Sequence, residues 1–237
     1  MEKVDLFFCG DSFTWGEELQ GTDNNHRRRE RERFSGVLAK RLGKTHQNIS
    51  RSGTSNDWIV KKTIEWFEQG NSCDTAIIQF SHEKRWLWYD KEGKQHHMPS
   101  KYKEKESYLY TSTEKEQAQH AYMKHVVSKD SVLDNYWKNM LMIRNYLKDK
   151  CNIIHLNLCE VPRVKNFWYD VVGNIDIIEL KPLLRGCKEN FTPILKSDIL
   201  DNNNNKRFSG AHPSAKGHKI ISETILDRHS DLVQECS

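Results

Sequence analysis

Short hydrophobic runs alternate along the chain with longer segments in which hydrophobic residues recur every three or four positions. The runs at residues 4–9, 75–80 and 152–158 are hydrophobic at most positions, and a weaker run covers residues 46–49. Strands without a polar face are typical of a parallel sheet that is covered by helices on both sides. This pattern predicts four parallel strands, with residues 4–9 in a central position.

The segments with helical periodicity lie between and after these runs, at residues 34–42, 56–67, 131–148 and 215–226. Each places hydrophobic side chains on one stripe, and Gly43 follows the first of them as a typical helix end. Alternating strands and helices indicate an α/β fold, a three-layer α/β/α sandwich with a doubly wound, mainly parallel sheet.

Two long segments interrupt the alternation. Residues 83–129 are polar and rich in aromatic residues, and residues 162–207 have a mixed character and include a run of asparagines near their end. The chain has 237 residues and no linker rich in Pro or in Gly and Ser. We therefore expect a single domain over residues 1–237 in which both segments are insertions.

Composition narrows the function classes. Lys and Arg total 37 and Asp and Glu total 33, so the net charge of +4 is too small to indicate a nucleic-acid partner. No stretch approaches the ~20 hydrophobic residues of a membrane span, and the N-terminus lacks the pattern of a signal peptide. The six cysteines form no Cys-x-x-Cys pair, which argues against a zinc site and a disulfide scaffold. We expect a cytoplasmic protein with free thiols, no metal, no cofactor and no membrane partner.

The strongest chemical signal is the sequence Gly-Asp-Ser-Phe-Thr-Trp-Gly at residues 10–16, directly after the first predicted strand. Its serine, Ser12, would lie on a strand-to-helix turn at the carboxyl edge of the sheet, where open α/β sheets bind ligands. Helix N-terminal amides can stabilise negative charge there. In the alternative interpretation, Ser12 or Asp11 only caps a helix.

A second signal stands near the other end of the chain, in Ser-Gly-Ala-His-Pro at residues 209–213. His212 of this motif would precede the last predicted helix, from which it can act as general base to a serine. Alternatively, it is a surface histidine before a helix that begins near a proline.

Together the two motifs resemble those of the SGNH hydrolases, the GDSL lipase and esterase superfamily. The resemblance implies a flavodoxin-like fold in which Ser12 is the nucleophile and His212 its base. Residues 48–56 resemble the family's second block, which implies that the Gly53 amide joins the Ser12 amide in an oxyanion hole. The role of a turn glycine between strand and helix is compatible with this one.

The chain departs from the family pattern in two places. Ser209 stands where the family has an aspartate that orients the base; a serine can accept a hydrogen bond from His212 but supplies no negative charge. The family's third block carries an asparagine, and residues 79–85 contain none. Ser81 or His82 could donate to the oxyanion instead, and the sequence does not decide between them.

The divergent third block resembles that of SGNH-like proteins in phage and bacterial surface-sugar loci, which implies an acylated sugar or another polar ester as substrate. Arg85 could meet a carboxylate or phosphate there, although a surface salt bridge is the commoner role of a single arginine. Residues 26–33 contain five arginines interleaved with two glutamates. They could bind phosphate, but a solvated helix face or the rim of the active site is favoured.

The sequence therefore predicts a serine esterase or deacylase that acts on a small-molecule or carbohydrate acyl ester. Two alternatives stay open. One is a catalytically weak binding or assembly protein on the same fold, which the loss of the family's Asp and Asn favours. The other is an acyltransferase that uses the same serine.

Overall fold

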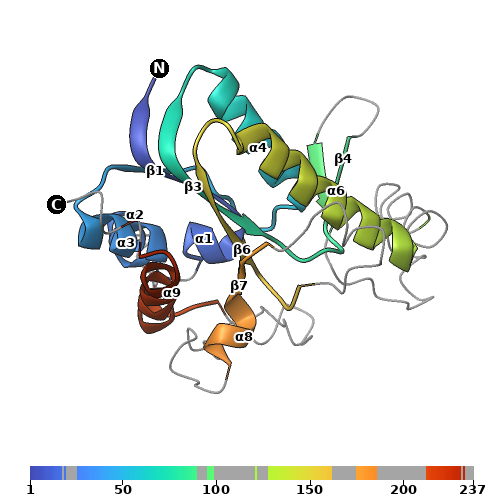
Figure 1. Ribbon diagram of the computed structural model, residues 1–237. Coiled ribbons are helices and arrows are strands. Elements are labelled where there is room, and N and C mark those ends of the chain that lie inside the picture. The colour runs from blue at the N-terminus through green and yellow to red at the C-terminus, as the bar shows by residue number, and fades with distance from the viewer. Residues whose placement is uncertain are drawn as a thin grey trace.

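A computed structural model describes residues 1–17, 19, 26–89, 95–98, 121, 128–161, 175–185, 212–230 and 232. Five parallel strands form one sheet in the order β2-β1-β3-β6-β7 (Figure 1). They are β1 (Lys3–Cys9), β2 (His46–Asn48), β3 (Ser72–Phe80), β6 (Asn152–Asn157) and β7 (Ile177–Glu179). The predicted doubly wound α/β fold is confirmed. β1 is an interior strand as expected, although the middle position belongs to β3.

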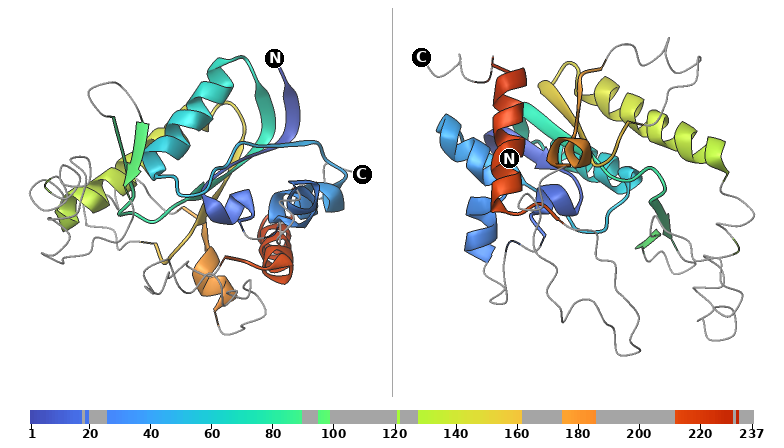
Figure 2. Two further views of the ribbon diagram at one scale, coloured as in Figure 1. Left: turned by 180° about the vertical axis from the view of Figure 1, so that it is seen from behind. Right: turned by 90° about the horizontal axis from the view of Figure 1, so that it is seen from below.

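Helices cover both faces of this sheet (Figures 1 and 2). One face is covered by α4 (Asn56–Glu68) and α6 (Lys129–Leu147), and the other by α3 (Phe34–Leu42) and α9 (Ala215–Arg228). Three short helices complete the described core: α1 (Ser12–Trp15), α2 (His26–Glu32) and α8 (Leu180–Leu184). None of the helices that the structure describes is both long enough and hydrophobic enough to span a membrane.

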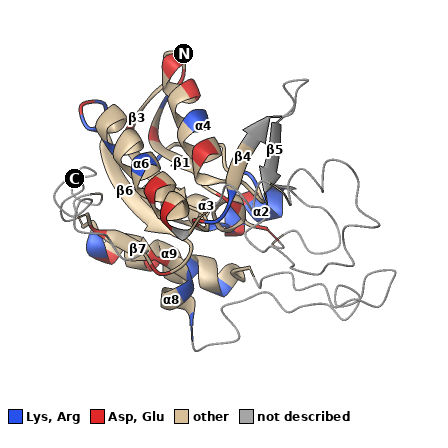
Figure 3. Ribbon diagram, turned by 90° about the vertical axis from the view of Figure 1, so that its right-hand side faces the viewer, with Lys and Arg blue, Asp and Glu red and all other residues tan. Residues whose placement is uncertain are grey.

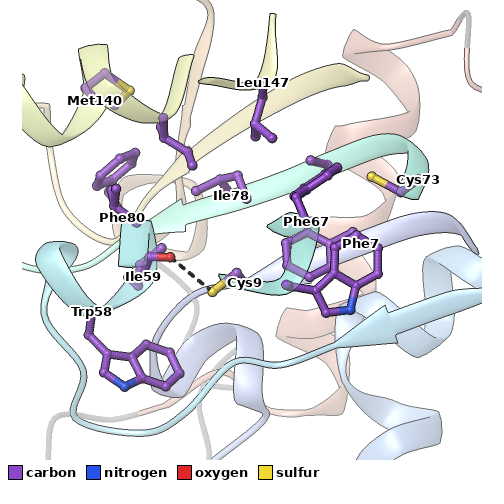
Figure 4. Packing of buried hydrophobic residues seen from close by; sticks show 14 of the residues in the cluster. Phe7, Cys9, Trp58, Ile59, Phe67, Cys73, Ile78, Phe80, Met140 and Leu147 are labelled. Carbon is purple, nitrogen blue, oxygen red and sulfur yellow. Dashed lines mark hydrogen bonds between the residues drawn. The ribbon is translucent and has the colours of Figure 1, made fainter. Parts of the chain in front are cut away.

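Side chains of β1 alternate between two hydrophobic clusters, which explains its unbroken hydrophobic run. Phe7 and Cys9 face α4, where Phe7 stacks on Trp66 at a centroid distance of 4.3 Å. The Cys9 thiol donates to the carbonyl of Ile59 at 3.6 Å (Figure 4). Burial raises the pKa of Cys9 to about 12, so this thiol acts as a small hydrophobic group, as expected.

The structure also contains elements that the hydrophobic pattern does not predict. β7 and α8 lie within the second predicted insertion, and β4 (Trp86–Tyr89) pairs with β5 (Gln95–Met98) as an antiparallel hairpin within the first. β7 is only three residues long, too short to give a recognisable run. The remainder of both predicted insertions lies largely outside the described residues.

His155 on β6 makes stability depend on pH. Its side chain is buried, and its Nδ1 has no hydrogen-bond partner among the described residues. Burial, assisted by the charge of Arg144, lowers the pKa of His155 to about 4, whereas the unfolded chain has a pKa of about 6.5. The unfolded state therefore binds an extra proton between these values, and stability falls as the pH falls from about 6.5 to 4.

We expect the variant His155→Phe, which retains a ring beside Phe80, to lose this part of the pH dependence. The slope of the unfolding free energy over that window should decrease by up to about 1.4 kcal/mol per pH unit. Urea unfolding at a series of pH values measures it. Parallel curves for the variant and the natural sequence would show that His155 does not titrate in this way.

Candidate active site

The Ser12 turn follows directly from the end of β1. Gly10 leaves the strand, Asp11 is the N-cap of α1, and its Oδ1 accepts a hydrogen bond from the Phe13 N–H at 3.0 Å. A Cβ on Gly10 would lie 2.8 Å from the Gln79 side chain, so the close approach of β3 requires glycine there. Ser12 is the first residue of α1 and its side chain is nearly buried.

Gln79 supports the turn from the neighbouring strand. The register of Cys9 opposite Ile78 brings Gln79 beside the chain that leaves β1. Its Oε1 accepts from the Asp11 N–H at 3.1 Å and from the Thr14 hydroxyl at 2.8 Å. This role of Gln79 was not predicted; its signal in the sequence is a polar residue inside a hydrophobic strand.

Asp11 also anchors a buried ion pair. Its Oδ2 accepts from the Ser81 hydroxyl at 2.8 Å and from Arg85 Nη1 at 3.0 Å. Arg85 Nη1 donates in addition to Ser81 Oγ at 2.8 Å and to the Thr54 carbonyl at 3.4 Å. The Ser81 amide donates to Asn56 Oδ1 at 2.7 Å. Both polar groups of Ser81 that can donate are therefore engaged inside the protein.

Arg85 and His82 differ from Ser81 in the hydrogen-bond donors that remain unused. Nε and Nη2 of Arg85 make no hydrogen bond to any residue that the structure describes, and its side chain is 20% exposed. His82 is half-buried, with Nδ1 3.0 Å from the Glu83 carboxylate. Ser81 and His82 were the predicted substitutes for the family's asparagine, but Arg85 retains more unused donors than either.

The loop that carries Gly53 is fixed to the same turn. The Arg51 N–H donates to the Gly10 carbonyl at 3.2 Å, and the Thr54 hydroxyl contacts that carbonyl at 3.4 Å. Gly53 has a φ of +75°, a conformation that favours glycine. Within the described part of the chain, no hydrogen bond uses the N–H of Gly53 or of Ser12. Two amides near the end of β1 are thus available to an anion.

His212 comes to this edge from the other end of the chain. Its ring centroid lies 5.8 Å from that of Phe13, the residue after the predicted nucleophile. No hydrogen bond joins the side chains of Ser12 and His212 in this structure, and catalytic hydrogen bonds are often loose without substrate. Ser209 lies outside the described residues, so its contact with His212 stays a prediction.

Comparisons with known proteins bear on the fold. Similar solved structures include the acetyl xylan esterase Est2A of the rumen bacterium Butyrivibrio proteoclasticus, with 13% identity, a TM-score of 0.51, and coverage of 98% of this chain and 64% of that one. LAE5, an α/β hydrolase enzyme from the metagenome of Lake Arreo, has 10% identity, a TM-score of 0.51, and coverage of 97% and 96%. TesA has 12% identity and a TM-score of 0.50, with coverage of 96% of this chain and 99% of that one. No family model and no curated protein sequence matches the chain.

Proposed function

We propose that this chain, which has the fold of the SGNH hydrolases, is a serine esterase or deacylase for a small-molecule or carbohydrate acyl ester. The observation that supports the proposal is the position of His212, whose ring lies 5.8 Å from that of Phe13, the residue after Ser12. β2 lies on one side of β1, and the later strands β3, β6 and β7 follow on the other side. The strand order therefore reverses beside β1, and open α/β sheets bind ligands at such a point.

The reaction has two steps at Ser12. In the first, His212 takes the hydroxyl proton while Oγ attacks the acyl carbonyl, and the protonated imidazole then gives that proton to the departing alcohol. This leaves an acyl group on Ser12. In the second step, water loses a proton to His212 and attacks the acyl carbon, and the carboxylic acid leaves as Oγ regains the proton.

The oxyanion that forms in each step needs donors. The unused amides of Ser12 and Gly53 supply two of them, and the Arg85 guanidinium supplies the third in place of the family's asparagine. A preorganised donor of this kind is worth a few kcal/mol of transition-state stabilisation. The retained donors of Arg85 support this assignment over Ser81, whose hydroxyl is held by Asp11 at 2.8 Å.

The orientation of His212 is tested at Ser209. If Ser209 accepts a hydrogen bond from the imidazole, Ser209→Ala lowers kcat, by less than the ~10⁴-fold loss that follows neutralisation of a triad aspartate. Ser209→Asp should raise kcat, because a carboxylate stabilises the imidazolium. Steady-state kinetics measures both. Unchanged rates in both variants would make Ser209 a turn residue and leave the orienting group elsewhere.

The proposed activity itself is tested by covalent labelling. A fluorophosphonate should label Ser12, identified by peptide mass spectrometry, and Ser12→Ala should remain unlabelled. A panel of short-chain and sugar acetate esters then defines the substrate; Est2A is an acetyl xylan esterase, which makes acetylated sugars the first group to try. Adding alcohol acceptors distinguishes hydrolysis from acyl transfer. The absence of labelling would favour a binding or assembly protein.

A further inference from the structure

The arginine-rich segment is divided by its helical geometry into an exposed set and a buried pair. Arg27, Arg28 and Arg31 are exposed on α2, whose many basic residues appear in blue in Figure 3. Arg29 and Arg33, four positions apart, are only 4% and 5% exposed. The predicted solvated helix face therefore holds for three of the five arginines, and the buried pair requires a separate explanation.

Arg33 is a buried cation for which no carboxylate of the described residues lies within ion-pair distance, although the charge of Glu30 acts to raise its pKa. Its side chain forms no ion pair or hydrogen bond with any residue that the structure describes, and its Nε is fully enclosed. Burial lowers the pKa of Arg33 to about 10. Removing a guanidinium from water without a compensating acceptor costs several kcal/mol. The Arg29 guanidinium carbon lies 3.7 Å above the Trp15 ring, which adds a second positive charge nearby.

A second enclosed donor belongs to His218 on α9. Its Nδ1 accepts a hydrogen bond from the Phe34 N–H at 3.1 Å, so the neutral ring carries its proton on Nε2. That Nε2 is buried without a partner. Phe34 directly follows Arg33, so His218 is hydrogen-bonded to the residue next to that buried arginine. Burial lowers the pKa of His218 to about 3, and the charges of His212 and Arg33 contribute to this shift.

This cluster of Arg29, Arg33 and His218 adjoins the turn of the predicted nucleophile. Gly16 ends α1, and a Cβ at that position would lie 2.9 Å from the Cβ of Arg33 and 3.1 Å from the Cγ of Arg29. Asn48 holds α1 against the start of α3, because its Nδ2 donates to the Thr14 carbonyl at 3.0 Å and to the Ser35 hydroxyl at 2.9 Å.

We propose that Arg29, Arg33 and His218 form a binding site for a small oxyanion, a carboxylate or phosphate group, beside the Ser12 turn. An oxyanion offers only acceptors, which is what the Arg33 Nε–H and the His218 Nε2–H lack among the described residues, and its charge compensates the buried Arg33 guanidinium. The group can be part of the ester substrate, a version that rests on the proposed esterase function, or it can be a free anion that binds independently of catalysis.

Thermal unfolding tests the site without any need for activity. Inorganic phosphate at about ten times its dissociation constant should raise Tm by roughly 3–6 °C relative to chloride of equal ionic strength. Arg33→Met should abolish this shift, and its Tm without phosphate should be equal to or above that of the natural sequence, because the uncompensated charge is gone. Arg31→Met removes an exposed arginine of the preceding helix α2 and should retain the shift. An equal shift in Arg33→Met, or none in the natural sequence with phosphate or acetate, would overturn the proposal.

A second measurement distinguishes an oxyanion that is part of the substrate from a free anion. Ser12→Ala should retain the phosphate shift, so loss of esterase activity and loss of the anion site have different signatures. If the oxyanion belongs to the substrate, KM for a phosphate-bearing acetyl ester should rise at least tenfold in Arg33→Met relative to a neutral acetyl ester, and free phosphate should compete with that ester. If Arg33→Met changes KM equally for the two esters while phosphate still raises the Tm of the natural sequence alone, the site binds a free anion.

Discussion

Ester hydrolysis is expected to fall about 10⁴–10⁶-fold in kcat when Ser12 is replaced with alanine, because the acyl group then has no nucleophile to receive it. His212→Ala should cost a similar factor, since the Ser12 hydroxyl would keep its proton. The double variant should be no slower than the worse single variant, because residues that act as one unit lose their effect together. Steady-state kinetics on the best ester of the panel measures all three.

The control for this prediction lies at the opposite edge of the sheet. Ser72 is exposed at the amino end of β3, and Ser72→Ala should leave kcat unchanged. If Ser12→Ala retains the rate, the turn after β1 does not supply the nucleophile and the esterase proposal fails. Additive losses in the double variant would mean that the serine and the histidine act independently.

The fold was predictable because burial on two faces produces a pattern that is visible in the sequence. Phe7 and Phe8 face opposite helical layers, so β1 could not be mistaken for a strand with a solvated face. β7 was not predicted, because its three residues, Ile177–Glu179, are too few to form a recognisable hydrophobic pattern. Its place in the sheet is set by pairing with β6, which the local sequence does not encode.

The candidate site was predictable only where a short motif reports it. Ser12 and His212 stand in such motifs, whereas the support around them depends on partners far apart in the chain. The bond between Asp11 and Gln79 spans 68 positions, and the one between Asp11 and Arg85 spans 74. Both require the register of β1 against β3, which is a property of the folded sheet.

For the buried arginines Arg29 and Arg33, the sequence pattern was ambiguous between an exposed and a buried position. The four-residue spacing of Arg29 and Arg33 is that of one side of a helix; both side chains are buried, although α2 ends at Glu32 and Arg33 is the N-cap of α3. A charge run with glutamates among the arginines is usually solvated. Only the packing of Gly16 against both side chains shows which arginines turn inward.

Arg85→Ala is expected to lower the free energy of unfolding by about 2–4 kcal/mol, because it leaves the Asp11 carboxylate buried without its counterion. Asp11 is fully enclosed, and its partner Arg85, 3.0 Å away, is 20% exposed. Urea unfolding measures the loss. The matched control is Arg185→Ala, since the Arg185–Glu160 pair has side chains 73% and 68% exposed; that change should cost less than about 1 kcal/mol.

A second substitution distinguishes a lost charge partner from a lost packing contact. Asp11→Asn in the Arg85→Ala background removes the uncompensated charge, and its Oδ1 can still accept from the Phe13 N–H. The double variant should therefore be more stable than Arg85→Ala alone, a coupling that a double-mutant cycle quantifies. If Asp11→Asn only adds to the loss, Arg85 stabilises the turn by packing on Ser81 and Thr54. In the expected case, Arg85 stabilises the turn that positions Ser12 chiefly through its charge.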